Sequence, residues 1–296
     1  MMKERIHIAT ASDRNMAPGL HVMLLSCMQS LSSSAACTFH LYLKDFGGSD
    51  INLIHATLGD YADRVEILLH DVSNIELPKG KGISGNRMCY TLFAALNQSV
   101  SDYIIWIDAD MIVLVDLLKV WLKREESESF AMVVARRKLA FAHPMERSLM
   151  HKYGMKDDDP FFNSAFVAVD STKYRELSGF EKNLDFIEKH PEQGDQGAVN
   201  QLFMGDLELL DHKYNTPFWP HNRTPDLNPS DMVCHFIGSP KPWDLFGNFV
   251  HPSYPLFKEW IERTAFGKTY RWRYFSVTAW SRFLRILYKY KVFFKR

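Results

Sequence analysis

Two aspartates, Asp108 and Asp110, follow a short apolar run and are the first candidates for chemistry in this sequence. The run itself, residues 103–107, is rich in β-branched and aromatic residues and too short for a typical helix, so we predict a buried strand. Side chains two residues apart in an extended chain lean to the same side, which would bring the two carboxylates together. Such a pair needs neutralisation, and carboxylate oxygens suit Mg²⁺ or Mn²⁺. The alternative is a strand that ends in a polar, helix-capping turn.

A histidine far downstream offers a third ligand. His235 follows an apolar run and leads into a Gly/Pro turn that contains Gly238, Lys241 and Trp243. Imidazole beside carboxylates fits Mn²⁺ better than Ca²⁺. Gly238 permits close backbone approach, and Lys241 supplies a positive charge for a phosphate. Considered singly, His235 is better explained as a core histidine and Lys241 as a solvated loop cation.

Five segments in this order resemble the retaining glycosyltransferases of family 8, which have a GT-A fold. The nearest pattern is that of the bacterial lipopolysaccharide and lipooligosaccharide galactosyl- and glucosyltransferases. The five segments are residues 8–15, 108–110, 160–165, 194–200 and 235–243. The resemblance implies a retaining hexosyltransferase that moves galactose or glucose from a UDP-sugar to a saccharide acceptor. That acceptor would be the growing core oligosaccharide of a lipopolysaccharide, or another glycolipid.

The resemblance also implies residue roles. Asp108, Asp110 and His235 would hold Mn²⁺, with Mg²⁺ as the other option. Asp195 and Gln196 would act at the anomeric carbon, and both an enzymic carboxylate nucleophile and a front-face route remain open. The residues expected to contact the nucleotide sugar are Ala11, Asp13, Asn15, Arg87, Asp108, Ala109, Asp110, Asn163, Asp195, Gln196, Gly238 and Lys241.

Two positions in the donor site leave alternatives open. Asp13 can accept from the imide N–H of uracil, but Asp13 and Asn15 also suit a capped turn before a helix. The family usually has a basic residue 17 positions before its first motif aspartate, where this chain has Thr91. Arg87 lies one helical turn earlier and is a candidate replacement.

The elements that must position these residues alternate between strands and helices, which predicts an α/β fold with a largely parallel sheet. This is the Rossmann-like arrangement of the GT-A fold, and it places ligands at the carboxyl ends of the strands. The predicted helices are residues 21–32, 51–62 and 87–97. The glycine- and lysine-rich stretch 79–85 is expected to be a loop. The predicted strands are residues 5–11, 38–43, 65–69, 103–107, 131–135 and 166–169.

Composition separates the chain into two parts. After Glu262 there are ten Lys or Arg and no acidic residue, so the first 262 residues carry the whole acidic excess of a chain with 35 charges of each sign. We therefore expect a catalytic domain at 1–262 and a basic, aromatic helical tail at 263–296. Trp280, Phe283 and Leu284 begin a helical apolar stripe, which favours attachment to an anionic membrane surface. The alternative is a terminal helix docked on the acidic body. No reading motif for nucleic acid accompanies the charge.

The cysteines and the N-terminus indicate the cellular compartment, and the motifs leave several classes of function open. The four cysteines are scattered, which fits a reducing compartment, and the N-terminus shows no apolar signal region. We expect a cytoplasmic protein that is peripherally associated with the inner face of the cytoplasmic membrane. Three other functions share parts of the pattern: a self-glucosylating transferase of the glycogenin type, a metal-dependent nucleotide hydrolase or nucleotidyltransferase, and an inactive lectin-like module.

Overall fold

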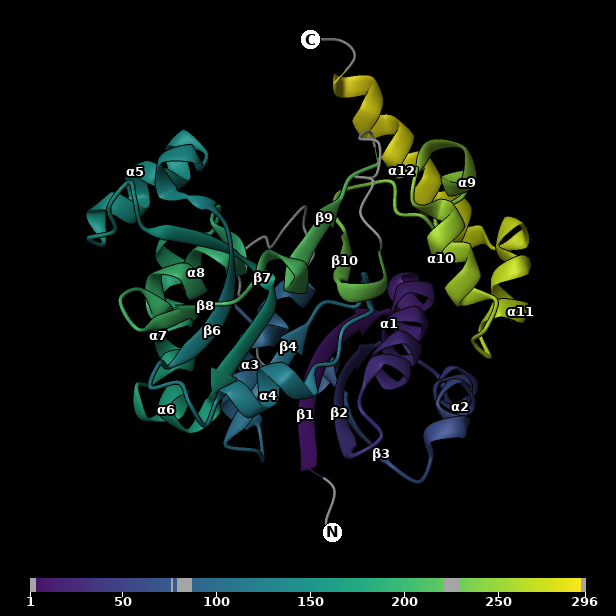
Figure 1. The fold of residues 1–296 in the computed structure, drawn as a ribbon. Helices are drawn as coiled ribbons and strands as arrows, with labels where there is room; N and C mark the ends of the chain where they lie inside the picture. The colour runs from purple at the N-terminus through teal and green to yellow at the C-terminus, as the bar shows by residue number, and fades with distance from the viewer. Residues whose placement is uncertain (1–3, 76, 79–86, 221–228, 294–296) are drawn as a thin grey trace.

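The larger sheet has seven strands in the order β3-β2-β1-β4-β7-β6-β8 in the computed structural model, which describes residues 4–75, 77–78, 87–220 and 229–293 (Figure 1). Its strands are β1 (Glu4–Asp13), β2 (Ala35–Lys44), β3 (Val65–Asp71), β4 (Tyr103–Ile107), β6 (Ala131–Lys138), β7 (Pro160–Asp170) and β8 (Leu207–Leu209). The first four of these are parallel, whereas β7 runs antiparallel to both β4 and β6. The predicted α/β fold is confirmed, and all six predicted strands are present. The expected loop at 79–85 lies outside the described residues.

The helices cover both faces of this sheet. They are α1 (Ala17–Ser30), α2 (Gly48–Thr57), α3 (Thr91–Gln98), α4 (Leu118–Lys123), α5 (Pro144–Lys152), α6 (Ser171–Glu176), α7 (Gly179–Lys189), α8 (Gly194–Phe203), α9 (Gly247–Val250), α10 (Tyr254–Ile261), α11 (Gly267–Arg271) and α12 (Val277–Phe293). The three predicted helices occur as α1, α2 and α3 with shifted ends. Helix α1 starts four residues earlier than predicted because Pro18 suits a first helical turn.

Two hydrophobic cores follow from the alternation of side chains along the strands. In β4, Ile105 and Ile107 belong to the core that the sheet shares with α1 and α2. Ile104 and Trp106 point to the opposite face and pack with residues of α3, α7 and α8. The strand is therefore buried on both faces, as its continuous apolar sequence predicted.

A smaller sheet of order β5-β10-β9 stands beside the carboxyl end of β4. Its strands are β5 (Met111–Val113), β9 (Thr216–Phe218) and β10 (Val233–Phe236). Strand β10 is antiparallel to β5 with His235 opposite Met111, and the Phe236 amide donates to the Asp110 carbonyl over 3.0 Å. These strands were not predicted. The pairing of β5 with β10 joins segments more than 100 residues apart, which local sequence patterns do not report.

Helix α1 touches the loop after β4 at Gly19, which yields a stability prediction. A Cβ on Gly19 would lie 2.6 Å from the Ala109 carbonyl oxygen and 2.7 Å from the Trp243 ring. We expect Gly19→Ala to lower the free energy of unfolding by about 1–3 kcal/mol, because the crowded atoms must shift. Gly59→Ala is the matched control, since its Cβ would meet nothing within 4 Å. Chemical denaturation of both variants checks this, and equal stabilities would contradict the close approach.

The C-terminal segment begins inside the packed structure and ends outside it. Tyr270 of α11 is buried and packs on Phe257 of α10. Helix α12 then extends along the edge of the molecule, past α9 (Figure 1). Its first turns are docked: Arg282 forms an ion pair of 2.5 Å with Asp244, and the Phe283 ring lies 5.0 Å from that of Phe246. Within the described part of the chain, every helix is too short or too polar to traverse a bilayer.

Candidate active site

Asp108 and Asp110 lie where β4 ends and the chain turns into β5. The Asp108 amide donates to the Ala165 carbonyl over 2.9 Å, and its carboxylate accepts from the Trp106 indole N–H over 2.9 Å. Strand β1 is the parallel neighbour of β4, with Ala9 opposite Trp106, so Ala11 and Asp108 both stand two residues further along. The sheet order reverses beside β1, which is the position where open α/β sheets bind ligands.

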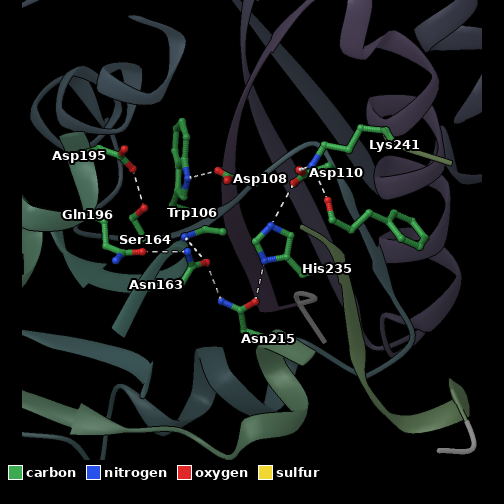
Figure 2. A network of polar contacts seen from close by, with 12 residues as sticks. Trp106, Asp108, Asp110, Asn163, Ser164, Asp195, Gln196, Asn215, His235 and Lys241 are labelled. Carbon is green, nitrogen blue, oxygen red and sulfur yellow. Dashed lines mark hydrogen bonds and ion pairs between the residues drawn. The ribbon is translucent and has the colours of Figure 1, made fainter. Parts of the chain in front are cut away.

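The three predicted metal ligands meet in space. One ligand atom from each of Asp108, Asp110 and His235 lies within 4.8 Å of the other two (Figure 2). The pairing of β10 with β5 brings His235 next to Asp110, and its Nε2 is 3.5 Å from Asp110 Oδ1. That oxygen is buried and has no hydrogen-bond partner in the part of the chain that the structure describes. Two carboxylates and an imidazole around an unsatisfied buried oxygen fit a divalent cation such as Mn²⁺ or Mg²⁺.

The His235 ring presents the correct nitrogen to that position. Its Nδ1 lies 2.9 Å from the Asn215 amide oxygen, which can only accept, so Nδ1 carries the hydrogen and Nε2 keeps its lone pair. Burial lowers the pKa of His235 to about 4, and the charges of Lys241 and Arg136 act in the same direction against the attraction of Asp110. The imidazole is therefore neutral near pH 7, as a metal ligand must be.

Lys241 lies deeper than its expected role at a phosphate suggested. Its ammonium group is 2.5 Å from Asp110 Oδ2 and also donates to the Phe236 carbonyl. Burial raises the pKa of Asp110, but the attraction of Lys241 and His235 outweighs it and lowers the pKa overall. Burial, together with the charges of Asp110 and Asp195, raises the pKa of Asp108 to about 8. One carboxylate is thus neutralised by lysine and the other by a proton.

The different protonation of Asp108 and Asp110 predicts how metal affinity depends on pH. Since the pKa of Asp108 is about 8, its carboxyl is mostly protonated at pH 6–7 and a metal must displace that proton. We expect Mn²⁺ affinity to rise about tenfold per pH unit from pH 6 to 8, and then to level off. Calorimetry in buffers with different ionisation enthalpies should show about one proton released at pH 6.5. In Asp108→Asn the residual affinity should lose this slope, and an unchanged slope would contradict the assignment.

A second polar group lies beside the first and comes from β7 and α8. The Asn163 amide donates to Gln196 Oε1 over 3.0 Å, and the Ser164 hydroxyl donates to Asp195 Oδ2 over 2.5 Å (Figure 2). Gly194 starts α8 with φ +65°, a conformation that favours glycine. Burial raises the pKa of Asp195 despite the hydrogen bond from Ser164. Carboxylate and amide groups in this arrangement can hold sugar hydroxyls.

The other predicted donor-site residues are placed as follows. Asp13 ends β1, and its carboxylate accepts from the amides of Asn15 and Met16 over 2.9 and 3.2 Å, so it caps the turn before α1. Gly238 occupies its turn with φ +82°. Arg87 donates to the carbonyls of Leu77 and Pro78. All of these contacts are made within the protein. The expected roles of Asp13 at uracil and of Arg87 and Gly238 at the diphosphate therefore stay predictions.

Sequence reasoning missed Asn215. It is buried, lies at the end of a 3₁₀ turn before β9 and contacts both His235 and Asn163 (Figure 2). No spacing rule marks it, because its partners come from β10 and β7. A cavity of about 110 Å³ adjoins it, and Asn163, Arg136 and His212 contribute to its lining. The indole of Trp106 was predicted only as part of a strand.

Comparison with known proteins identifies the family to which this sequence is similar. Residues 7–246 match the family model described as Glycosyl transferase family 8. The chain is 23% identical over 265 residues to the lipopolysaccharide 1,3-galactosyltransferase of Salmonella typhimurium, with 86% of this chain and 77% of that protein covered.

Solved structures show the same fold. The galactosyltransferase LgtC, in complex with donor and acceptor sugar analogues, superposes with a TM-score of 0.68 at 18% identity and covers 88% of this chain and 96% of its own. The bifunctional glycosyltransferase WbbM gives a TM-score of 0.73 at 15% identity over 90% of this chain. Because that alignment spans only 51% of WbbM, the present chain corresponds to about half of it.

Proposed function

The chain belongs to glycosyl transferase family 8, and on that premise we propose that it transfers galactose or glucose from a UDP-sugar to the growing core oligosaccharide of a lipopolysaccharide or to another glycolipid. It is a retaining, UDP-sugar-dependent glycosyltransferase with a GT-A fold. The observation that supports the proposal most is that the Asp108, Asp110 and His235 cluster lies next to the Asn163 and Gln196 pair. The first group suits a diphosphate with its metal, and the second suits the hexose.

In the proposed reaction, the bond between the anomeric carbon and the β-phosphate oxygen breaks and a bond from the acceptor hydroxyl oxygen to that carbon forms. The departing phosphate takes up the hydroxyl proton. A divalent cation held by the three ligands would stabilise the charge that develops on UDP. We expect Mn²⁺ to serve best, because the ligand set includes an imidazole. Lys241 is close enough to this position to contribute a positive charge to the departing phosphates.

The donor and acceptor are tested together. UDP release is measured from UDP-galactose and UDP-glucose with Mn²⁺, with and without a truncated lipopolysaccharide acceptor, and the product linkage is read by NMR. Acceptor-dependent UDP release with retained anomeric configuration supports the proposal. Incorporation of hexose into the protein itself would instead indicate a self-glucosylating enzyme, and release of hexose 1-phosphate would indicate a hydrolase or nucleotidyltransferase.

We also propose that α12 attaches the enzyme to an anionic membrane surface. Beyond the docked residues Arg282 and Phe283, its apolar stripe continues through Leu284, Leu287 and Tyr288, which are exposed by 60%, 45% and 73%. An exposed apolar face beside the exposed Arg285, in a segment whose sequence is rich in arginine and lysine, suits a helix lying in the membrane interface. This would bring the active site to a lipid-linked saccharide on the cytoplasmic leaflet.

Three substitutions on this exposed stripe test the attachment. We expect Leu284→Ser combined with Leu287→Ser and Tyr288→Ser to weaken binding to phosphatidylglycerol-containing vesicles by about tenfold or more, because apolar burial supports interfacial binding. UDP-sugar hydrolysis should stay within about twofold, since the Arg282–Asp244 contact is kept. The same change at the exposed Leu122 of α4 is the control. Failure of the wild-type protein to bind such vesicles at low salt would exclude the attachment.

A further inference from the structure

A chain of side-chain hydrogen bonds joins the metal ligands to the sugar-facing amides. The His235 Nδ1 contacts Asn215 Oδ1 at 2.9 Å, and Asn215 Nδ2 donates to Asn163 Oδ1 over 3.2 Å. Asn163 Nδ2 in turn donates to Gln196 Oε1 over 3.0 Å (Figure 2). The four residues come from β10, the turn before β9, β7 and α8. Asn215 stands between the two halves of the site and contacts both.

The direction of each hydrogen bond is fixed by the groups that can donate. Asn163 Oδ1 also accepts from the Ala165 amide over 3.3 Å, which orients the Asn163 side chain independently of Asn215. The Asn215 amide must therefore turn its NH₂ toward Asn163 and its oxygen toward His235. Only a His235 with hydrogen on Nδ1 completes this arrangement, and that tautomer leaves Nε2 free of hydrogen on the side of Asp110.

We propose that Asn215 is a positioning residue that serves both halves of the site. Its oxygen holds His235 in the tautomer that binds metal, and its NH₂ group orients Asn163, and through it Gln196, toward the hexose. One buried side chain thereby links the geometry of metal binding to that of the sugar. The metal half of this inference rests on structure alone, whereas the sugar half also rests on the proposed function.

Asn215→Asp separates the two contacts, because a carboxylate has nearly the same shape but no N–H. It still accepts from His235 Nδ1, so we expect Mn²⁺ affinity, measured by electron paramagnetic resonance, to stay within about threefold or to increase. It cannot donate to Asn163, so we expect the turnover number for UDP-sugar to fall about 10–100-fold while the UDP dissociation constant changes little. Asn215→Leu removes both contacts and should lose metal affinity about 10–100-fold as well.

A double-mutant cycle tests the route through Asn163. If Asn215→Asp acts by releasing Asn163, its effect on turnover should nearly vanish in an Asn163→Ala background. Asn183→Asp is the matched control, since this buried asparagine of α7 donates to Tyr174 of α6 and lies outside both halves of the site. Thermal unfolding of all variants identifies any that fail to fold. Full additivity of the two substitutions would overturn the sugar half of the inference.

The tautomer can be read without any transfer assay. In the metal-free protein, ¹⁵N chemical shifts of labelled His235 should show hydrogen on Nδ1 in the wild type and in Asn215→Asp, and a mixture or the other tautomer in Asn215→Leu. Hydrogen on Nε2 in the wild type would overturn the metal half. A wild-type protein with this tautomer and Mn²⁺ affinity, but without hexose transfer, would contradict the proposed function and leave the tautomer assignment standing.

Discussion

Asp110→Asn is expected to reduce hexose transfer by about 10³-fold or more. The substitution removes one of the three proposed metal ligands together with its negative charge. A bound metal contributes several kcal/mol of charge stabilisation, and each factor of ten in rate corresponds to about 1.4 kcal/mol. It also leaves the buried Lys241 without its carboxylate partner. Initial rates with UDP-galactose and UDP-glucose at saturating Mn²⁺ measure the loss, and Mn²⁺ binding measured separately should weaken in parallel.

Loss of fold is the competing explanation, because breaking a buried ion pair costs about 3–5 kcal/mol. Asp108→Asn distinguishes the two. The pKa of Asp108 is about 8, so at pH 7 this carboxyl is largely protonated and a neutral amide in its place should not destabilise the protein, although it still removes a ligand. Asp116→Asn, at a capping aspartate that follows β5, is the control for surface effects. Full transfer in Asp110→Asn, or in the wild type with excess chelator, would remove the metal from the mechanism.

The fold was predictable where the signal is local. The apolar run 103–107 is buried on both faces, and the expected strands and helices of the first half all form. The sequence did not predict the antiparallel direction of β7, because side-chain alternation carries no information on strand direction. It also missed β5, β9 and β10, whose three or four residues are shorter than any periodic pattern can establish.

The site residues, too, include some that the sequence indicates and others that only the tertiary structure reveals. Asp108, Asp110 and His235 have residue types and motif spacing that indicate metal binding, and the structure brings them together. Asn215 has neither, since an isolated asparagine before a turn is ordinary. Its importance arises from β10 and β7, which place His235 and Asn163 on either side of it. The pairing of Lys241 with Asp110 likewise depends on the tertiary position of a turn 131 residues downstream.

Gln196 gives the second large effect. Its Oε1 accepts from Asn163, and its backbone lies in the first turn of α8, next to Asp195. If it acts at the anomeric centre, its contacts strengthen as the bond to UDP breaks, and they contribute to turnover more than to binding. We expect Gln196→Ala to lower the turnover number about 10²-fold and to leave the UDP dissociation constant within about twofold.

The distinction between turnover and binding decides the role of Gln196. Single-turnover rates with enzyme in excess exclude product release as the affected step, and titration with UDP and Mn²⁺ gives the binding constant. Gln201→Ala removes the same side chain from a later turn of α8, outside the polar group, and should change neither quantity. If Gln196→Ala weakens UDP binding as much as it lowers turnover, the residue organises the site as a whole. A normal turnover number would instead leave the reacting face to Asp195, whose carboxylate is buried and held by Ser164.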